Sequence, residues 1–328
     1  MQRQPSLVQL VLPLWRFPAG RWLLPAGLAL LAGLGPAATA RAEGVVDRVA
    51  RSGELVMVGD PDQAPMLSVD AKGQPVGYAV EVANRIAAEL AAAVGRPVRL
   101  RFEAVADPAD LGQRLEGGKA DLACGVPFTW ARDITLDYSL PFGLSGLRLL
   151  APAGRLDGSP QSLAGRRIGV VSDSLGATEL KGIQPAARPV GFADLPQAVA
   201  ALRAGQLDGV IGDSARLASL AATRQGGPVL AQTPAQPYES YALACLVPEN
   251  DSTFRNLVNL AVARLLQGYL DGEPEAVSSV DRWVGPGSVL NRTPDQIRNY
   301  FDAVLLGVEA LRPLPAQAGA APSSPSAP

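Results

Sequence analysis

The chain has 328 residues, 48% of them hydrophobic, and a formal net charge of −2. The first 42 residues hold four of the 29 basic residues and none of the 31 acidic ones, so the rest carries 25 basic and 31 acidic side chains. This mildly acidic balance argues against nucleic acid as a partner. The remainder is long enough for one large domain or for two lobes of ordinary size.

The chain contains no histidine. This excludes Ser-His-Asp and Cys-His catalysis and His-based metal sites, because histidine is the commonest general base and a leading zinc ligand. The glycines form neither a G-x-G-x-x-G motif nor a P-loop. We therefore expect no catalytic residue, no metal and no cofactor.

Two cysteines, Cys124 and Cys245, are too few for a multi-cysteine metal site. In an oxidising compartment they can form one disulfide. Two separate buried apolar cysteines are an equally good interpretation of the sequence.

Residues 1–42 have the pattern of a secretory signal peptide. Arginines precede a short apolar stretch at 23–38, and small residues follow at 38–42. The apolar stretch is too short, and too interrupted by glycine and proline, to span a membrane well. We expect cleavage near residues 40–42, no lipid anchor, and a mature protein that is periplasmic or secreted.

After this leader, strand and helix patterns alternate, which is typical of parallel sheets with crossover helices. The predicted elements are a strand at 55–58, a helix at 80–94, a strand at 98–102, a helix after Asp107 that ends at Gly117, and a strand at 120–124. Asp107 is the expected N-cap of its helix, with Pro108 in the first helical position. The pattern predicts an α/β fold.

The chain also repeats itself. Residues 115–125 (LEGGKADLACG) align without gaps on residues 202–212 (LRAGQLDGVIG), and 55–60 align on 168–173. The first alignment places Asp107 on Asp194, so each copy has an aspartate as the expected helix cap. Two related lobes explain this better than chance similarity does. Near the C-terminus, 294–311 predicts an amphipathic helix packed on a core, and 313–328 predicts a disordered tail.

Five segments, in order, carry a resemblance to a known family. They are VGDPDQAPMLSVDAKGQPVGYAVEVA, GGKADLACG, TWARDITLDYSLPF, LAGRRIGVV and GVIGD. Together they resemble the bacterial extracellular solute-binding proteins, family 3, the polar amino acid ABC-transporter type of periplasmic binding protein, over about residues 55–283. The resemblance implies the type II periplasmic binding protein fold, in which two Rossmann-like lobes are joined by a two-segment hinge. It implies lobe 1 at 43–150 and 241–312, and lobe 2 with the hinge segments at 151–240.

The resemblance also implies ligand-binding positions. Arg132 would hold a ligand carboxylate from lobe 1, and Asp213 would hold a ligand ammonium from lobe 2. An ion pair of Arg132 with Asp133 or Asp137, and a helix cap at Asp213, are the structural alternatives. The other expected site residues are Asp60, Thr129, Ser172, Ser174, Tyr78 and Trp130. For Asp60 a turn is an equal alternative.

The sequence departs from the family pattern at several of these places. Gln63 and Pro108 stand where aromatic side chains usually enclose the ligand, and Pro127 stands where a serine or threonine is usual. With these changes and with the stretch PFGLSGLRLLAPAG, the chain resembles a subgroup of orphan substrate-binding-like proteins. Proteins of that subgroup are associated with the maturation of a glycine-rich-repeat peptide.

Three functions are consistent with the sequence. The first is a monomeric, extracytoplasmic binding protein that closes on an amino acid or another small carboxylate, with an ABC permease as a possible partner. The second is an orphan protein with a degenerate cleft that binds a secreted glycine-rich peptide. The third is an enzyme on the same fold that uses a cleft carboxylate; Glu179 is its candidate acid, although an ordinary first-turn helix position explains Glu179 better.

Overall fold

The computed structural model describes residues 43–105, 107–172, 174–223 and 227–307. The predicted signal peptide and the predicted tail at 313–328 lie outside the described residues. The chain divides into the units Met1–Ala42 and Glu43–Pro328, and every described residue belongs to the second unit. Within the described ranges, no helix has the length and hydrophobicity needed to cross a membrane.

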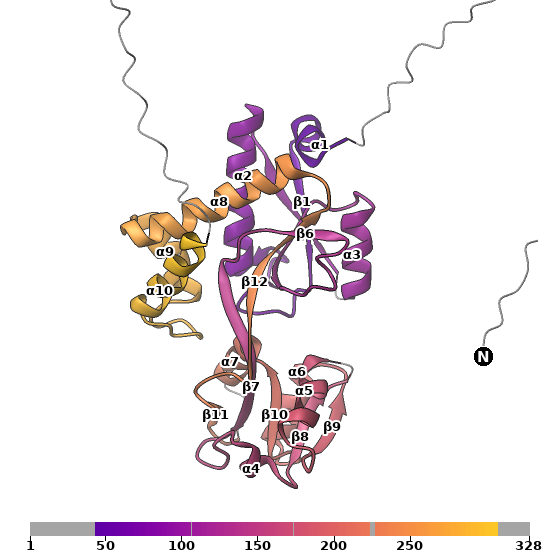
Figure 1. Cartoon of the computed structure of the whole chain (residues 1–328), viewed down its shortest axis with the longest axis vertical. Coiled ribbons are helices and arrows are strands. Elements are labelled where there is room, and N and C mark those ends of the chain that lie inside the picture. Colours follow the sequence, from indigo (N-terminus) through magenta and orange to yellow (C-terminus); the bar gives the residue numbers. More distant parts are fainter. Residues whose placement is uncertain (1–42, 106, 173, 224–226, 308–328) are drawn as a thin grey trace, which may run out of the picture. The chain divides into compact units, whose positions relative to one another are not determined.

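The described elements form two α/β lobes connected by two long strands (Figure 1). Lobe 1 contains α1 (Val45–Ser52), β1 (Glu54–Gly59), β2 (Ser68–Val69), β3 (Pro75–Val76), α2 (Tyr78–Val94), β4 (Arg99–Ala104), α3 (Pro108–Glu116), β5 (Ala123–Pro127), β6 (Leu136–Tyr138), α8 (Ser252–Asp271), α9 (Pro274–Trp283) and α10 (Pro294–Leu306). Lobe 2 contains α4 (Pro160–Leu163), β8 (Arg167–Val171), α5 (Leu175–Ile183), β9 (Arg188–Phe192), α6 (Leu195–Arg203), β10 (Gly209–Asp213), α7 (Ser214–Ala222) and β11 (Leu230–Thr233). The connecting strands are β7 (Gly143–Pro152) and β12 (Glu239–Pro248).

The strands β7 and β12 pair with each other and with both lobes. Residues 143–147 of β7 lie antiparallel to residues 239–243 of β12. Beyond that ladder, β12 pairs with β5 and β6 of lobe 1, and β7 pairs with β10 and β11 of lobe 2. In lobe 2, β10, β8 and β9 are parallel neighbours, as are β1 and β4 in lobe 1. The predicted α/β fold with two lobes and two connections is confirmed.

Most predicted elements are present, and their ends follow local chemistry. Asp107 caps α3 through its side chain, which accepts from the Ala109 backbone N–H, and Asp194 caps α6 in the same way from Gln197. The strand predicted at 120–124 lies three residues later, at 123–127. The reason is that residue 122 makes only an isolated parallel bridge to β1, whereas the antiparallel ladder with β12 begins at residue 123.

Each lobe has its own buried apolar core. In lobe 1, α2 and α8 pack together over β5, and α10 adds Ile297 and Phe301, which are 4% and 2% exposed. This confirms that the apolar face of α10 packs on a core. In lobe 2, one smaller cluster contains buried side chains of β7, β8, β10 and α5. Another contains buried side chains of β7, β10, α6 and α7.

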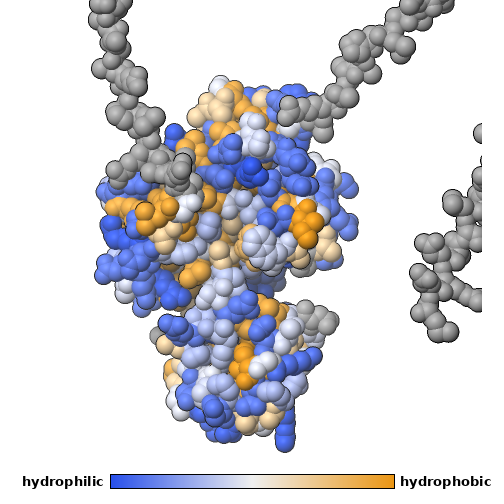
Figure 2. Space-filling model, viewed as in Figure 1, coloured by the Kyte–Doolittle hydropathy of each residue, from blue (hydrophilic) through white to orange (hydrophobic). Residues whose placement is uncertain are grey.

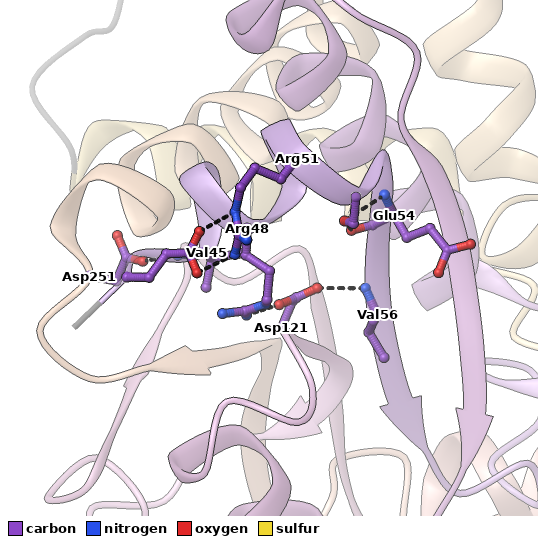
Figure 3. Close-up of polar contacts among 9 residues, drawn as sticks. Val45, Arg48, Arg51, Glu54, Val56, Asp121 and Asp251 are labelled. Atoms are coloured by element: carbon purple, nitrogen blue, oxygen red, sulfur yellow. Dashed lines mark hydrogen bonds and ion pairs between the residues drawn. The ribbon is translucent and has the colours of Figure 1, made fainter.

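The helix α1 is fixed to lobe 1 by polar contacts (Figure 3). Asp121, which is 1% exposed, forms an ion pair with Arg48 of α1 and accepts a hydrogen bond of 2.7 Å from the Val56 backbone N–H of β1. Asp251, at the start of α8, accepts from the Val45 backbone N–H at 2.7 Å. A buried carboxylate of this kind is stable because it is paired and hydrogen-bonded. These contacts join three regions that are far apart in sequence: α1 with β1, the segment at Asp121, and the start of α8.

Cys124 and Cys245 form a disulfide, and the described residues include no free cysteine. The two residues are direct partners in the β5–β12 ladder. Of the two interpretations left open by the sequence, the disulfide is the correct one. It links β5 covalently to the strand by which the chain returns to lobe 1.

Candidate functional site

The turn that carries Arg132 follows β5. The Thr129 carbonyl accepts hydrogen bonds of 3.2 Å from the backbone N–H groups of Arg132 and Asp133. The Tyr138 hydroxyl accepts from the Thr129 N–H at 3.2 Å and donates to the Pro127 carbonyl at 3.0 Å. The turn is therefore fixed through its backbone and through Tyr138. The Thr129 side chain is exposed and has no hydrogen bond with the described residues.

Arg132 is half-buried, and its guanidinium makes no hydrogen bond or ion pair within the described part of the chain. The structural alternative was an ion pair with Asp133 or Asp137, but Asp137 pairs with Arg255 of α8 at 2.8 Å. Arg132 lines a cavity of about 200 Å³, together with residues of α3 and the apolar Leu136 and Leu246. A planar guanidinium with free donors, beside a cavity, can bind a carboxylate by donating two parallel hydrogen bonds to it.

Asp213 is the last residue of β10, and both of its carboxylate oxygens accept hydrogen bonds. Its Oδ1 accepts from the Arg216 backbone N–H at 2.9 Å, which caps α7. Its Oδ2 accepts from the Ser145 hydroxyl at 2.7 Å and from the Tyr241 hydroxyl at 2.6 Å. Burial, followed by the neighbouring Asp213 carboxylate, raises the pKa of Tyr241, so its phenol remains a donor at neutral pH. The predicted capping role is confirmed.

The partners of Asp213 were not identified from the sequence. Ser145 and Tyr241 face each other in the β7–β12 ladder, so both hydroxyls lie on one side of the connecting strands. Ser145 and Tyr241 each stand in a mostly apolar segment, GLSGLRLL and ESYALACL, that also contains other polar residues, so the local signal was weak. Pairing them with Asp213 required the strand register.

The structure gives Asp60 a role in its turn. The Asp60 carboxylate accepts from the Asp62 backbone N–H at 2.9 Å and from the Gln63 side-chain amide at 2.6 Å. The turn alternative for this residue is therefore confirmed. Gln63, which stands where an aromatic residue was expected, is part of the same hydrogen-bonded loop.

Ser174 is the N-cap of α5. Its hydroxyl accepts from the Ala177 N–H at 3.3 Å and donates to the Val171 carbonyl at 2.7 Å. Ser172 is exposed just before it. Glu179, the candidate acid of the enzymatic alternative, lies on α5 and is half-buried.

The two aromatic candidates have opposite environments. Tyr78 is fully buried, and its hydroxyl donates to the Phe142 carbonyl at 3.1 Å. Trp130 is 77% exposed and packs edge-on against Phe128, with ring centroids 5.0 Å apart. Ile134, on the same turn, is 74% exposed. On the face viewed in Figure 2, hydrophobic patches are separated by hydrophilic surface.

The structure does not bring all eight predicted residues into one pocket. Thr129, Trp130 and Arg132 share the turn after β5, whereas Ser172 and Ser174 share the turn before α5. Tyr78 instead lines a second cavity at the connecting strands. No cluster of three or more acidic or cysteine side chains with metal-binding geometry occurs among the described residues.

Two α/β lobes connected by two antiparallel strands define the class of two-lobed binding proteins. The family model of bacterial extracellular solute-binding proteins, family 3, matches residues 55–276. The chain belongs to this family. It is an extracellular family, and the chain shares its fold.

The chain is also similar to individual proteins and solved structures. The amino-acid-binding protein AabA of Dichelobacter nodosus is 28% identical over 66% of this chain and 83% of its own length. A protein of Neisseria gonorrhoeae described as a "Probable histidine-binding protein" is 29% identical over 56% of this chain and 64% of its own length. Among solved structures, the ancestral amino acid-binding protein AncCDT-1, a precursor of cyclohexadienyl dehydratase, superposes with a TM-score of 0.59. It is 20% identical and covers 74% of this chain and 99% of its own, so it bears on the fold alone.

Proposed function

We propose that this protein binds an amino acid, or a closely related small carboxylate, outside the cytoplasm. The observation that carries the proposal is Arg132, a guanidinium with no partner in the described chain, on the turn whose T-x-x-R sequence resembles the family's carboxylate-binding turn. Relatives named as amino-acid-binding proteins support this ligand class. The protein itself performs no chemistry on the ligand.

Asp213 is the proposed partner for the ligand ammonium. Its two oxygens offer about four acceptor positions, and three are used by Arg216, Ser145 and Tyr241. A ligand ammonium can therefore use the remaining position, or replace one of the two hydroxyl donors. A zwitterion held by Arg132 and Asp213 would link the two lobes and stabilise a closed form, as a signal to a membrane permease.

Thermal unfolding with the twenty common amino acids and a set of small carboxylates tests the proposal. A ligand present at about 100 times its dissociation constant adds about 2.7 kcal/mol, which raises the unfolding midpoint by roughly 5–10 °C. The Arg132→Gln variant should lose this rise. Arg188→Gln, at an exposed position on β9, is the matched control and should keep it.

Two results would contradict the proposal. One is a rise with an amino acid that survives in Arg132→Gln, which would move the ligand away from this turn. The other is conversion of the ligand, followed by nuclear magnetic resonance over several hours, which would favour an enzyme.

A second candidate is a peptide-binding role for the same surface. The observation that favours it is the exposure of Trp130 and Ile134 beside Arg132, at 77% and 74%. An apolar rim of this kind suits an extended peptide better than a small zwitterion. No stabilisation by any small molecule, together with saturable binding of a secreted glycine-rich peptide that Trp130→Ala removes, would favour this candidate.

A further inference from the structure

A cavity of about 250 Å³ lies against the connecting strands. Part of its lining comes from residues 284–301, which include the first part of α10. Other lining residues are Gly143, Leu144 and Ser145 of β7, Ser214 of α7, Pro237 just before β12 and Ser240 within β12. The part at 284–301 begins after residue 276, where the match to the family ends. The cavity is therefore built partly by a segment beyond the part of the chain that matches the family.

The walls are mainly apolar, with a few polar groups. The apolar lining side chains include Met66, Phe142, Leu144, Val284, Leu290 and Ile297. Two lining tyrosines already donate to β7 or the residue before it, Tyr78 to the Phe142 carbonyl at 3.1 Å and Tyr300 to the Gly143 carbonyl at 2.7 Å. Burial raises the pKa of both, so they are neutral at physiological pH. An apolar cavity with few polar groups is the usual form of a small-molecule site.

Arg292 is the one charged group among the lining residues. It is half-buried, and its guanidinium makes no hydrogen bond or ion pair within the described residues. A cation that is partly removed from water and has no partner is costly for the fold. Gln296 and Ser240, which also line the cavity, could add donors to any anion held by Arg292.

The positive charge of Arg292 also acts on a second arginine, Arg148. Burial, followed by repulsion from Arg292, lowers the pKa of Arg148. The Arg148 guanidinium donates to two backbone carbonyls, those of Pro234 at 2.8 Å and Gln232 at 2.9 Å, and forms no ion pair among the described residues. Neither guanidinium forms an ion pair among the described residues, and the carboxylate beside this cavity, that of Asp213, accepts from the lining Ser145 hydroxyl at 2.7 Å.

We propose that this cavity binds a small amphipathic carboxylate, with the carboxylate on Arg292 and an apolar body against the walls. A cavity of about 250 Å³ suits a compact ligand. The charged group of this site differs from those proposed for the amino acid, but the two sites adjoin. The lining includes Tyr78, Ser214 and Ser145, and the Ser145 hydroxyl donates to Asp213 at 2.7 Å.

Calorimetric titration of the whole purified protein with phenylacetate and hexanoate tests the site, with phenylacetamide as the neutral analogue. We expect submillimolar binding of the carboxylates and at least about tenfold weaker binding of the amide, because the charge-assisted hydrogen bonds to Arg292 are lost. Arg292→Gln should weaken carboxylate binding by a similar factor. Ser240→Trp, which places a large side chain at an exposed lining position, should block it.

Two control variants separate this site from the proposed amino acid site. Arg188→Gln should bind phenylacetate as the unchanged protein does, and Arg132→Gln should keep the phenylacetate binding that Arg292→Gln weakens. Loss of phenylacetate binding in Arg132→Gln with retention in Arg292→Gln would overturn the proposal, and so would equal affinities for phenylacetate and phenylacetamide. Absence of carboxylate binding in the unchanged protein would overturn it as well. Each variant's unfolding midpoint, measured without ligand, shows whether it is folded.

Discussion

The two lobes are stabilised by different kinds of contact. Lobe 1 joins segments that are far apart in sequence, and it contains the Cys124–Cys245 disulfide and the buried Asp121 with its contacts to α1 and β1. Lobe 2 is formed by one continuous stretch, and its polar contacts include helix caps such as those at Asp194 and Ser174. The difference is one of loop closure, because bringing distant segments together costs more chain entropy than folding a local unit. Removing a long-range contact from lobe 1 should therefore lower the free energy of unfolding more than removing a local contact from lobe 2.

Reduction of the disulfide should have the largest effect. The bond closes a loop with a sequence separation of 121 residues. Chain-entropy reasoning for a loop of that size gives a loss of close to 5 kcal/mol, within a measured range of about 2–5 kcal/mol. Urea unfolding with and without a reductant measures this loss. The double variant Cys124→Ser, Cys245→Ser should behave as the reduced protein does and show no further response to reductant, and a reductant effect in that variant would disprove the assignment.

Asp121→Ala should have the next largest effect. The substitution leaves Arg48 and the Val56 N–H without their partner, but Arg48 is 29% exposed and can be partly hydrated. We expect a loss of about 2–3 kcal/mol in the free energy of unfolding, measured by urea denaturation. Asp47→Ala, at an acidic first-turn position on the same helix, is the control and should change stability by less than about 0.5 kcal/mol. Equal effects of the two would mean that the buried contact is unimportant.

Tyr241→Phe tests the contact of β12 with lobe 2. It removes the 2.6 Å hydrogen bond to Asp213 but leaves the one from Ser145, so we expect a loss of about 1 kcal/mol. It also frees an acceptor position on Asp213. If Asp213 binds the ligand ammonium, the affinity for an amino acid found in the thermal screen should rise severalfold. Asp213→Asn should lower that affinity, and an unchanged affinity in both variants would restrict Asp213 to its structural role.

Counted per residue, the smallest effect concerns high pH. Tyr78, Tyr241 and Tyr300 have raised pKa values in the folded protein, mainly because of burial. A raised folded pKa gives stability that is fully present below the unfolded value, near 10, and is lost as the pH rises above it. We expect a flat response from about pH 7 to 9.5, and then, between about pH 9.5 and 10.5, a loss of somewhat under ~1 kcal/mol per tyrosine. The slope should be shallower in Tyr241→Phe, and equal slopes would contradict the assignment.

The sequence by itself determined the features that depend on short segments. Asp107 and Asp194 cap their helices as predicted, because an N-cap needs only a side chain two or three residues from its donor. The alternation of strands and helices, and the ordered motifs, were sufficient to predict two α/β lobes and the family. The turn that carries Arg132 was also predicted from its local motif.

The tertiary structure alone decided which distant groups meet. The Cys124–Cys245 bond, the Ser145 contact with Asp213, and the cavity at Arg292 all join segments more than 60 residues apart in sequence. No local pattern encodes such contacts, because they depend on strand register and on the packing of α10 beside the connecting strands. The same limit explains why Tyr78, predicted at the ligand, is a core residue: its environment is set by segments that arrive from elsewhere in the chain.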